Sequence, residues 1–260
     1  MNENVETRTP AQLQFRRRPA AYATTTTTFD HKFIAFLISA SGVGQNDRVL
    51  DLACGSGSAT IAFARRCAGA VGIDVTPAPL QRARADADAN GAANAAFVLG
   101  EIERLPFDDG AFTGSICRFS FHHFANPARV FAEMARVVAP GGWTAISDMT
   151  ASEDAEKAAL QNRLERLCDP THSRSLPISE FERMFAEHGF RVAMKVERDA
   201  RLTLDDWIRF GAPPPENESL LRELAADAVD GDKAGLRFAR DGDTIRLAHN
   251  SVTFVIEKED

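Results

Sequence analysis

Several features that mark envelope and secreted proteins are missing from this chain of 260 residues. Its four cysteines (Cys54, Cys67, Cys117 and Cys168) are widely spaced and form no CxxC pair. That spacing argues against a disulfide framework or a zinc site and predicts reduced thiols in a reducing compartment. No apolar run approaches the roughly 20 residues of a membrane span, and no apolar signal-peptide core opens the chain. We therefore expect a soluble, cytoplasmic protein.

Basic charge and tyrosine are also scarce. Lys and Arg number 30 against 37 Asp and Glu, a net charge of −7, and Tyr22 is the only tyrosine. A protein that binds a phosphate backbone must present a basic face, so this balance argues against a nucleic-acid partner. A small-molecule partner is the remaining expectation, with no membrane partner, and the sequence leaves monomer and homodimer equally open.

Strand and helix signals alternate along most of the chain. Residues 1–28 are polar and end in a threonine run, after which an apolar stripe predicts a helix over residues 30–39. The alternation is typical of an α/β fold, a parallel sheet with crossover helices. The predicted strands are residues 48–53, 70–75, 96–100, 112–119, 143–148, 190–196 and 251–257. The predicted helices are residues 59–67, 79–91, 127–138 (stopped by Pro-Gly-Gly at 140–142), 152–168 (capped by Ser152) and 179–188.

A glycine-rich turn joins the first predicted strand to the first crossover helix. Gly55 and Gly57 lie in this turn, where glycine lets the backbone approach a ligand and leaves the helix N-terminal amides pointing at it. A tight turn without a ligand would use the same residues. The strand–turn–helix context favours binding.

The second predicted strand ends in Asp74, 17 residues after Gly57. A carboxylate at this place can accept hydrogen bonds from both hydroxyls of an adenosine ribose. The alternative is that Asp74 caps the following helix, because Thr76 and Pro79 show that a helix begins nearby.

The charge beside the glycine turn separates two kinds of nucleoside cofactor. Asp51 would repel a pyrophosphate but would attract the ammonium of a methionyl group, directly or through water. Thr60 also stands where a dinucleotide site has a third glycine. These two residues favour S-adenosylmethionine (SAM), whose sulfonium is cationic, over NAD.

The third predicted strand leads into Glu101. Its carboxylate could accept a hydrogen bond from an adenine amino group, the amide of Ile102 could donate to a ring nitrogen, and Ile102 and Leu105 could pack on the base. A solvated acidic turn is the competing interpretation of this segment.

Four ordered motifs within residues 45–150 resemble class I SAM-dependent methyltransferases, specifically the methyltransferase type 11 family that includes ubiquinone and menaquinone C-methyltransferases. They are VLDLACGSGSATIAFA, VGIDVTP, GEIERLPFDDGAF, and FSFHHFANP followed by ARVVAPGGW. The resemblance implies a Rossmann-like fold with a mostly parallel seven-stranded sheet and transfer of a methyl group to a small, secondary or quinone-type metabolite. Two residues depart from the pattern, since Glu101 replaces the usual Asp and Thr113 replaces an acidic residue.

The resemblance also implies a domain organisation. Residues 1–30 are similar to an N-terminal arm that folds over the cofactor, which would place Tyr22 against the sulfonium. Residues 31–260 would form the methyltransferase domain, with a substrate-side helical insertion within residues 150–190. Closure of the arm would exclude water from the site.

Candidate catalytic residues follow the fourth predicted strand. His122 and His123 titrate near neutral pH and could take a proton from an acceptor, and we expect the two adjacent rings to point in different directions. Arg118 could bind a carboxylate of the cofactor or of the substrate. Asp148 and His172 are further candidate bases. No metal site is predicted.

Three other functions remain open on the sequence. The bound sulfonium could support an intramolecular or aminocarboxypropyl reaction that releases methylthioadenosine, the chain could bind SAM without catalysis, or it could be an NAD-dependent oxidoreductase. Product analysis and cofactor binding separate these functions.

Overall fold

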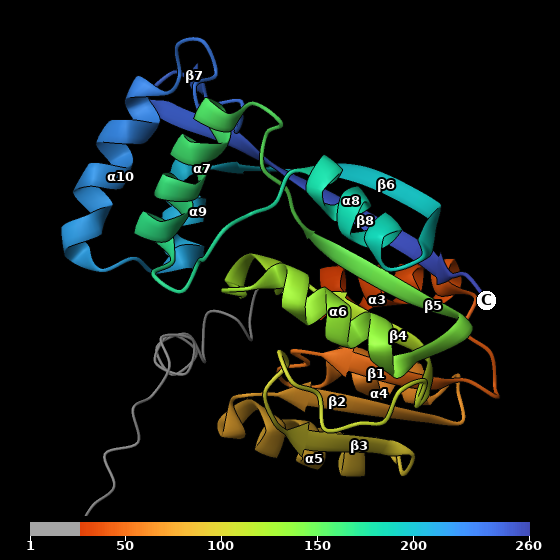
Figure 1. Cartoon of the computed structure of the whole chain (residues 1–260). Helices are drawn as coiled ribbons and strands as arrows, with labels where there is room; N and C mark the ends of the chain where they lie inside the picture. Colours follow the sequence, from red (N-terminus) through yellow and green to blue (C-terminus); the bar gives the residue numbers. More distant parts are fainter. Residues whose placement is uncertain (1–26) are drawn as a thin grey trace, which may run out of the picture.

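A parallel sheet forms the centre of the molecule (Figure 1). The computed structural model describes residues 27–260, with side chains from residue 31 onward; Tyr22 and most of the predicted arm lie outside this range. Each predicted central strand is present, and the strands run in the order β3-β2-β1-β4-β5. They are β1 (Arg48–Leu52), β2 (Gly69–Asp74), β3 (Ala95–Leu99), β4 (Phe112–Arg118) and β5 (Val138–Met149).

Two long antiparallel strands complete the sheet. β8 (Thr244–Lys258) pairs with β5, β6 (Phe190–Thr203) pairs with β8, and the short β7 (Ala239–Asp241) pairs with the start of β8. The mostly parallel Rossmann-like sheet is therefore confirmed, with seven strands in one path and β7 as an eighth beside it. The sequence prediction shortened β6 and β8, because the parts that extend past the central sheet pair with each other and not with the core.

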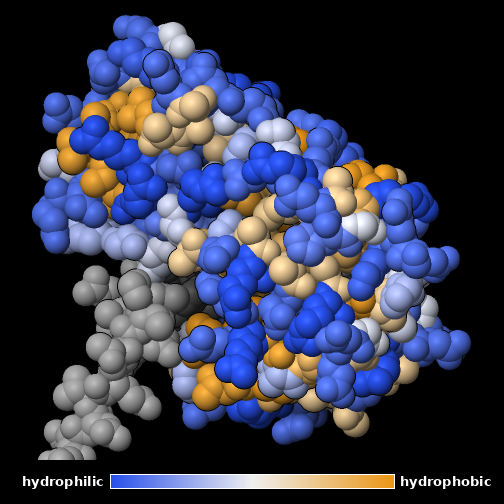
Figure 2. Space-filling model, in the orientation of Figure 1, coloured by the Kyte–Doolittle hydropathy of each residue, from blue (hydrophilic) through white to orange (hydrophobic). Residues whose placement is uncertain are grey.

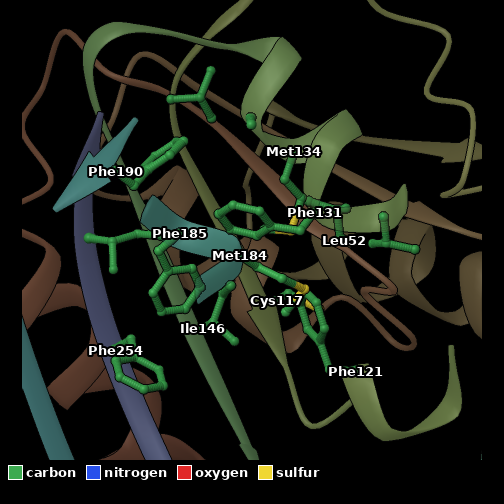
Figure 3. Close-up of a cluster of buried hydrophobic side chains, with 14 of the residues drawn as sticks. Leu52, Cys117, Phe121, Phe131, Met134, Ile146, Met184, Phe185, Phe190 and Phe254 are labelled. Atoms are coloured by element: carbon green, nitrogen blue, oxygen red, sulfur yellow. The ribbon is translucent and has the colours of Figure 1, made fainter. Parts of the chain in front are cut away.

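Helices cover both faces of the sheet. α6 (Pro127–Val137) and α8 (Ile178–Glu187) bury phenylalanines and methionines against one face, shown in Figure 3. The opposite face is covered by α3 (Thr27–Ser41), α4 (Ser58–Ala64) and α5 (Pro77–Ala89). α6 ends one residue earlier than predicted, and β5 begins directly after it, so the Pro-Gly-Gly segment lies inside the strand next to a register shift.

The remaining helices form a lobe with a core of its own. α7 (Ala155–Cys168), α9 (Leu204–Gly211) and α10 (Pro215–Asp227) pack around Trp207 and Leu221 at the far ends of β6 and β8. The sequence did not predict α9, α10 or β7. Within the predicted insertion at 150–190, α7 belongs to this lobe, whereas α8 packs on the central core.

The predicted Ser152 cap of α7 is wrong. The helix begins at Ala155, and the Asp154 carboxylate accepts hydrogen bonds from the amides of Glu156 and Lys157 at 2.9 and 3.1 Å. Ser152 instead accepts from the amide of Asp154 at 3.1 Å. A carboxylate at the N-terminus also interacts favourably with the helix dipole, which explains the preference for Asp154.

The visible surface is mostly hydrophilic, with apolar side chains in small separate groups (Figure 2). Among the described residues the large exposed apolar side chains are Leu99, Val192, Phe210 and Leu220, on four different elements. None of the helices over residues 27–260 is both long enough and apolar enough to span a membrane.

Candidate active site

The predicted site residues that the structure describes lie at the carboxyl edge of the parallel strands. The strand order reverses between β1 and β4, because β2 and β3 lie on one side of β1 and β5 lies beyond β4. Ligands of open α/β sheets bind in the crevice at such a switch point. Here the residues after β1, β2, β4 and β5 surround that position.

The turn after β1 is shaped for a close approach. Ala53, Gly55 and Gly57 all have positive φ (52°, 54° and 76°). A Cβ on Gly57 would lie 2.5 Å from the ring of Phe97, so this glycine is required for packing, whereas a Cβ on Gly55 would meet nothing within 4 Å. Gly55 therefore lies at the open side of the turn, where a ligand can reach the backbone.

Asp74 holds the same turn in place. Its carboxylate accepts from the amide of Gly55 at 2.9 Å and from the amide of Thr76 at 2.8 Å. Burial raises the pKa of Asp74, and the two amides oppose that rise. Thr76, not Asp74, is the N-cap residue of α5. Each carboxylate oxygen has a second lone pair, so the same group can still accept from ribose hydroxyls.

Asp51 is almost entirely buried at the end of β1. Thr60 donates a hydrogen bond of 2.6 Å to its carboxylate, and burial raises the pKa of Asp51 to about 6. Arg118 opposes that rise, and its guanidinium lies 3.4 Å from the hydroxyl of Ser58. Thr60, which stands where a dinucleotide site has its third glycine, is thus the residue that fixes Asp51.

The predicted adenine segment is attached to α6. Glu133 accepts from the amide of Leu105 at 2.7 Å, and Arg136 donates to the carbonyls of Leu105 and Phe107. Glu101 is exposed and Ile102 is half-buried, as contacts to a base would require. Leu105 is buried in the central core, so the expectation that it packs on the base is wrong.

A buried imidazole–carboxylate pair lies where β4 and β5 end. His122 Nδ1 lies 2.5 Å from Asp148 Oδ1, and the amides of Phe121 and Met149 donate to Asp148 at 2.6 Å each. Burial alone would lower the pKa of His122, but the Asp148 carboxylate raises it above its usual value. Burial would raise the pKa of Asp148, and His122 brings it below its usual value. The pair leaves Nε2 as the ring nitrogen that can accept a proton from a ligand.

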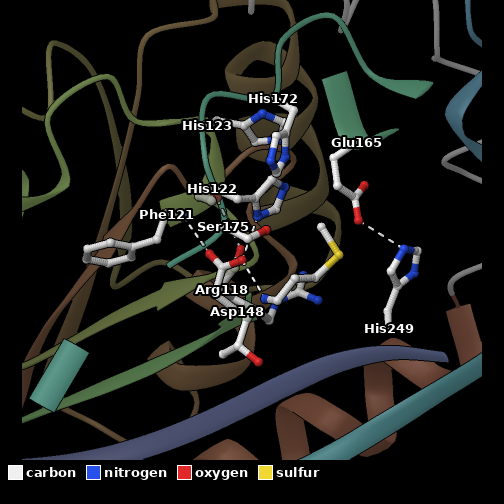
Figure 4. A network of polar contacts seen from close by, with 12 residues as sticks. Arg118, Phe121, His122, His123, Asp148, Glu165, His172, Ser175 and His249 are labelled. Atoms are coloured by element: carbon white, nitrogen blue, oxygen red, sulfur yellow. Dashed lines mark hydrogen bonds and ion pairs between the residues drawn. The ribbon is translucent and has the colours of Figure 1, made fainter. Parts of the chain in front are cut away.

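Two more histidines surround His122 (Figure 4). The rings of His122 and His123 are 4.1 Å apart, so the expectation that adjacent histidines point in different directions is wrong. A 3₁₀ turn, η1 (Phe121–His123), brings them together. His172 stacks on His122 at 5.6 Å. Burial lowers the pKa of both His123 and His172 to about 4, with His122 adding to the effect on His123, so only His122 combines a neighbouring carboxylate with a raised pKa.

Sequence reasoning missed a polar face of the lobe helix α7. Gln161, Asn162 and Glu165 are all buried on it. Asn162 Oδ1 accepts from Ser175 N at 2.7 Å and lies 2.8 Å from His172 Nε2, while Glu165 forms a 3.0 Å ion pair with His249 of β8. The signal available was the run of polar residues that face one side of a helix whose other residues pack in a core.

Thr113 does not enter this site. It lies at the start of β4, where its hydroxyl donates to Asp47 at 2.6 Å and accepts from the amide of Arg48 at 2.9 Å. Thr113, which departs from the family pattern, therefore links the starts of β1 and β4, at the edge of the sheet away from the site. Over residues 27–260 none of the four cysteines forms a disulfide, and no group of three His, Cys, Asp or Glu side chains could hold a metal ion.

The donor and acceptor groups at this edge fit a cationic amino-acid nucleoside. Asp74 and Glu101 stand at successive strand ends with acceptor oxygens, the space beside the Gly55 Cα is open to a ligand, and Asp51 supplies negative charge near this turn. No lysine or arginine stands in the glycine turn itself, residues 53–57, to receive a pyrophosphate.

Comparison with known proteins agrees with this geometry. A family model described as a methyltransferase domain matches residues 50–146. YcgJ of Bacillus subtilis, an uncharacterised methyltransferase, is 30% identical over 185 residues, which are 71% of this chain and 73% of YcgJ. The crystal structure of YcgJ has a TM-score of 0.82 at 26% identity and covers 88% of this chain and 99% of that one.

Two other similarities are weaker, one because it covers a shorter stretch and the other because its sequence identity is lower. A demethylmenaquinone methyltransferase of Thermus thermophilus is 40% identical over 97 residues, or 36% of this chain and 44% of that protein. Geranyl diphosphate C-methyltransferase of Streptomyces coelicolor, solved with S-adenosyl-L-homocysteine, has a TM-score of 0.59 at 15% identity over 88% of this chain and 77% of that one, which shows the fold alone. Because the match to YcgJ extends over most of both chains, this protein belongs to the class I methyltransferase family that the sequence motifs indicated.

Proposed function

We propose that this methyltransferase transfers a methyl group from SAM to a small-molecule acceptor, a secondary or quinone-type metabolite, and that His122 takes the acceptor's proton. The observation that carries the proposal is the His122–Asp148 pair at the ends of β4 and β5, on the far side of the switch point from Asp74. An imidazole held this way is the arrangement of a general base.

The residues that hold SAM are those around the glycine turn. Asp74 binds the ribose hydroxyls, Glu101 and the amide of Ile102 bind the adenine, and Gly55 and Gly57 let the backbone approach. Asp51 supplies negative charge for the methionyl ammonium, and Arg118 donates hydrogen bonds to the methionyl carboxylate. When bound, SAM supplies an electrophilic methyl group on a sulfonium. Tyr22 remains a proposed contact of the sulfonium.

The protein's own contribution to the reaction is alignment and proton transfer. Asp148 accepts a hydrogen bond from His122 Nδ1–H, so the lone pair on Nε2 can take the proton that the acceptor atom loses as it is methylated. The imidazolium that results is stabilised by the Asp148 carboxylate. Alignment of nucleophile and methyl group contributes on the order of 7–11 kcal/mol at best, and a positioned base about 10²–10⁴-fold in rate.

Isotope-labelled SAM provides the test. The purified protein is incubated with SAM that carries a deuterated methyl group and with a protein-free metabolite extract, and products are analysed by mass spectrometry. We expect a labelled metabolite and an equal amount of S-adenosylhomocysteine. Release of methylthioadenosine would favour the aminocarboxypropyl alternative, binding of SAM without any product would favour a non-catalytic binder, and binding of NADH in place of SAM would contradict the proposal.

A further inference from the structure

The lobe helix α7 buries polar side chains where a structural helix would bury apolar ones. Gln161 and Glu165 lie one turn apart on its buried face and are 1% and 3% exposed, while Leu164 faces the core of the lobe. Ser175, on the segment between α7 and α8, is 1% exposed and its amide donates to Asn162 of the same helix face. This face is therefore a buried polar surface.

Several polar atoms of this surface lack a hydrogen-bond partner among residues 27–260. They are Gln161 Oε1, Ser175 Oγ, Glu165 Oε1 and His249 Nε2. The last two contact each other in an ion pair at 3.0 Å, so within the described residues Gln161 Oε1 and Ser175 Oγ are the atoms of this surface that no polar group meets. The Gln161 amide is oriented by its bond to the carbonyl of Thr150, which leaves Oε1 as an acceptor.

Unpartnered buried polar atoms are costly to a protein. Each one lowers stability by about 1–3 kcal/mol, so native structures retain few of them without a functional reason. Glutamine and glutamate oxygens accept only, and the serine hydroxyl can accept as well. The surface is thus rich in acceptors and complements a molecule that donates hydrogen bonds.

This polar surface faces the proposed base. The charge of Glu165 acts on both His122 and His172, and Asn162, next to Gln161 in sequence, contacts His172 at 2.8 Å. Figure 4 shows the Glu165–His249 pair to the right of the three clustered histidines. Trp207 packs edge-on against His249 at 5.0 Å, and the His122 and His172 rings are stacked, so aromatic surfaces border the polar atoms.

We propose that Gln161, Glu165, Ser175 and His249 form the acceptor subsite of the enzyme, and that it takes an aromatic compound with at least two hydroxyl groups. One hydroxyl faces His122, and the other donates to the oxygens of Gln161 and Glu165. The inference rests on the proposed function, because it assigns the acceptor of the same site. The lobe then determines specificity, while the central sheet holds the cofactor.

Binding of two matched probes tests the subsite. Resorcinol and its dimethyl ether, 1,3-dimethoxybenzene, have the same ring, but only resorcinol donates hydrogen bonds. With S-adenosylhomocysteine present, we expect ligand-observed NMR to show that resorcinol binds about tenfold more tightly, as one hydrogen bond to a charged group predicts. Gln161→Leu and Glu165→Gln should each bring that ratio close to one, whereas Glu156→Gln, on the exposed side of α7, should leave it unchanged.

Ser175→Ala gives a second measurement, independent of the Gln161→Leu and Glu165→Gln variants. Because Ser175 Oγ has no partner within the described chain, its removal should leave the thermal midpoint of the unliganded protein unchanged or higher and weaken resorcinol binding. Equal affinities for the two probes, or no binding of resorcinol, would overturn the subsite. Calorimetry of the wild-type protein with SAM is the separate arm, since failure there removes the proposed function itself.

Discussion

The two halves of the site are built differently. On the β1–β3 side, Asp74 is fixed by amides of Gly55 and Thr76, and Asp51 is fixed by Thr60 nine residues away. On the β4–β5 side, His122 is fixed by Asp148, and His172 is fixed by Asn162 of the lobe. The first half is assembled by one turn and the strand beside it, the second by side chains from separate elements.

This difference separates a task that backbone geometry can perform from one that needs particular side chains. Backbone amides and a glycine turn suit any molecule with the same nucleoside, because they depend on chain geometry more than on side-chain identity. Imidazoles, carboxylates and amides from α7 and β8 can differ between relatives without moving the sheet. The lobe, with a separate core around Trp207 and Leu221, can vary in the same way.

Loss of the His122 imidazole should give the largest effect of the variants considered. It should affect turnover of the acceptor and leave the cofactor half unchanged. We expect His122→Gln to lower kcat about 10²–10⁴-fold, because the proton acceptor is lost. SAM affinity should change little, since Asp51, Asp74 and Glu101 remain. Turnover of the acceptor found with labelled SAM and calorimetry with SAM measure the two quantities. An equal loss of SAM affinity would show that the two halves are not separate.

The converse change is Asp74→Ala. It removes the acceptor of two amides and of the ribose hydroxyls, so SAM should bind on the order of 100-fold more weakly, as two lost charge-assisted hydrogen bonds predict. Asp86→Asn, which changes a partly exposed carboxylate of α5 paired with Arg82, is the matched control and should bind SAM normally. Unchanged affinity in Asp74→Ala would remove this residue from the cofactor site.

Gly57 and Gly55 lie in the same turn but are needed for different reasons, the first for packing and the second for the approach of a ligand. Gly57→Ala should destabilise the fold by about 1–3 kcal/mol, because its Cβ would overlap the ring of Phe97 at a positive φ. Gly55→Ala meets open space in the protein, so its cost in stability should be smaller and its main effect should be on SAM affinity. Chemical denaturation and calorimetry compare the two variants, and equal losses of stability would contradict the assignment.

The smallest effect is a shift in the pH dependence of turnover. Because Asp148 raises the pKa of His122, kcat/KM should increase with pH through an apparent pKa above 6.5, as the imidazole loses its proton. His123, His172, Glu165 and Asp169 also face this ring. In Asp148→Asn the carboxylate no longer opposes the effect of burial on the pKa of His122, so the rise in kcat/KM should move to lower pH. The maximum of kcat/KM should also fall, because the tautomer of His122 is no longer fixed. An unshifted profile would exclude the pair as the base.

The His122–Asp148 pair should also make the stability of the protein depend on pH. A histidine whose pKa is raised in the folded state stabilises that state most below its unfolded pKa, and the contribution is lost as pH rises through the folded value. The wild-type protein should therefore lose part of its thermal stability above that pKa. Asp148→Asn should lose this pH dependence, as measured by thermal midpoints across a pH series.

The sequence predicted the elements that carry the proposed cofactor half more completely than the side-chain contacts of the proposed acceptor half. The glycine turn, Asp74, and the five central strands follow from local patterns, because turn residues and apolar runs act over short stretches of chain. His122 was singled out, but not its pairing with Asp148, since 26 residues separate the two and only the parallel register of β4 and β5 brings them together. Leu105 and Ser152 were misjudged because neighbours in space, not in sequence, decide which side chain is buried and which one caps a helix.

By itself the sequence determined the alternating α/β pattern, the order of the cofactor motifs and the kind of nucleoside that their charges suit. Only the tertiary structure decided that α7 buries Gln161 and Glu165 on the side where Asn162 meets His172, that β6 and β8 extend into a lobe, and that Thr113 lies away from the site. The physical reason is the range of the interactions. Turns and periodic apolar patterns depend on nearby residues, whereas buried polar pairs form between groups that the chain brings together only when it folds.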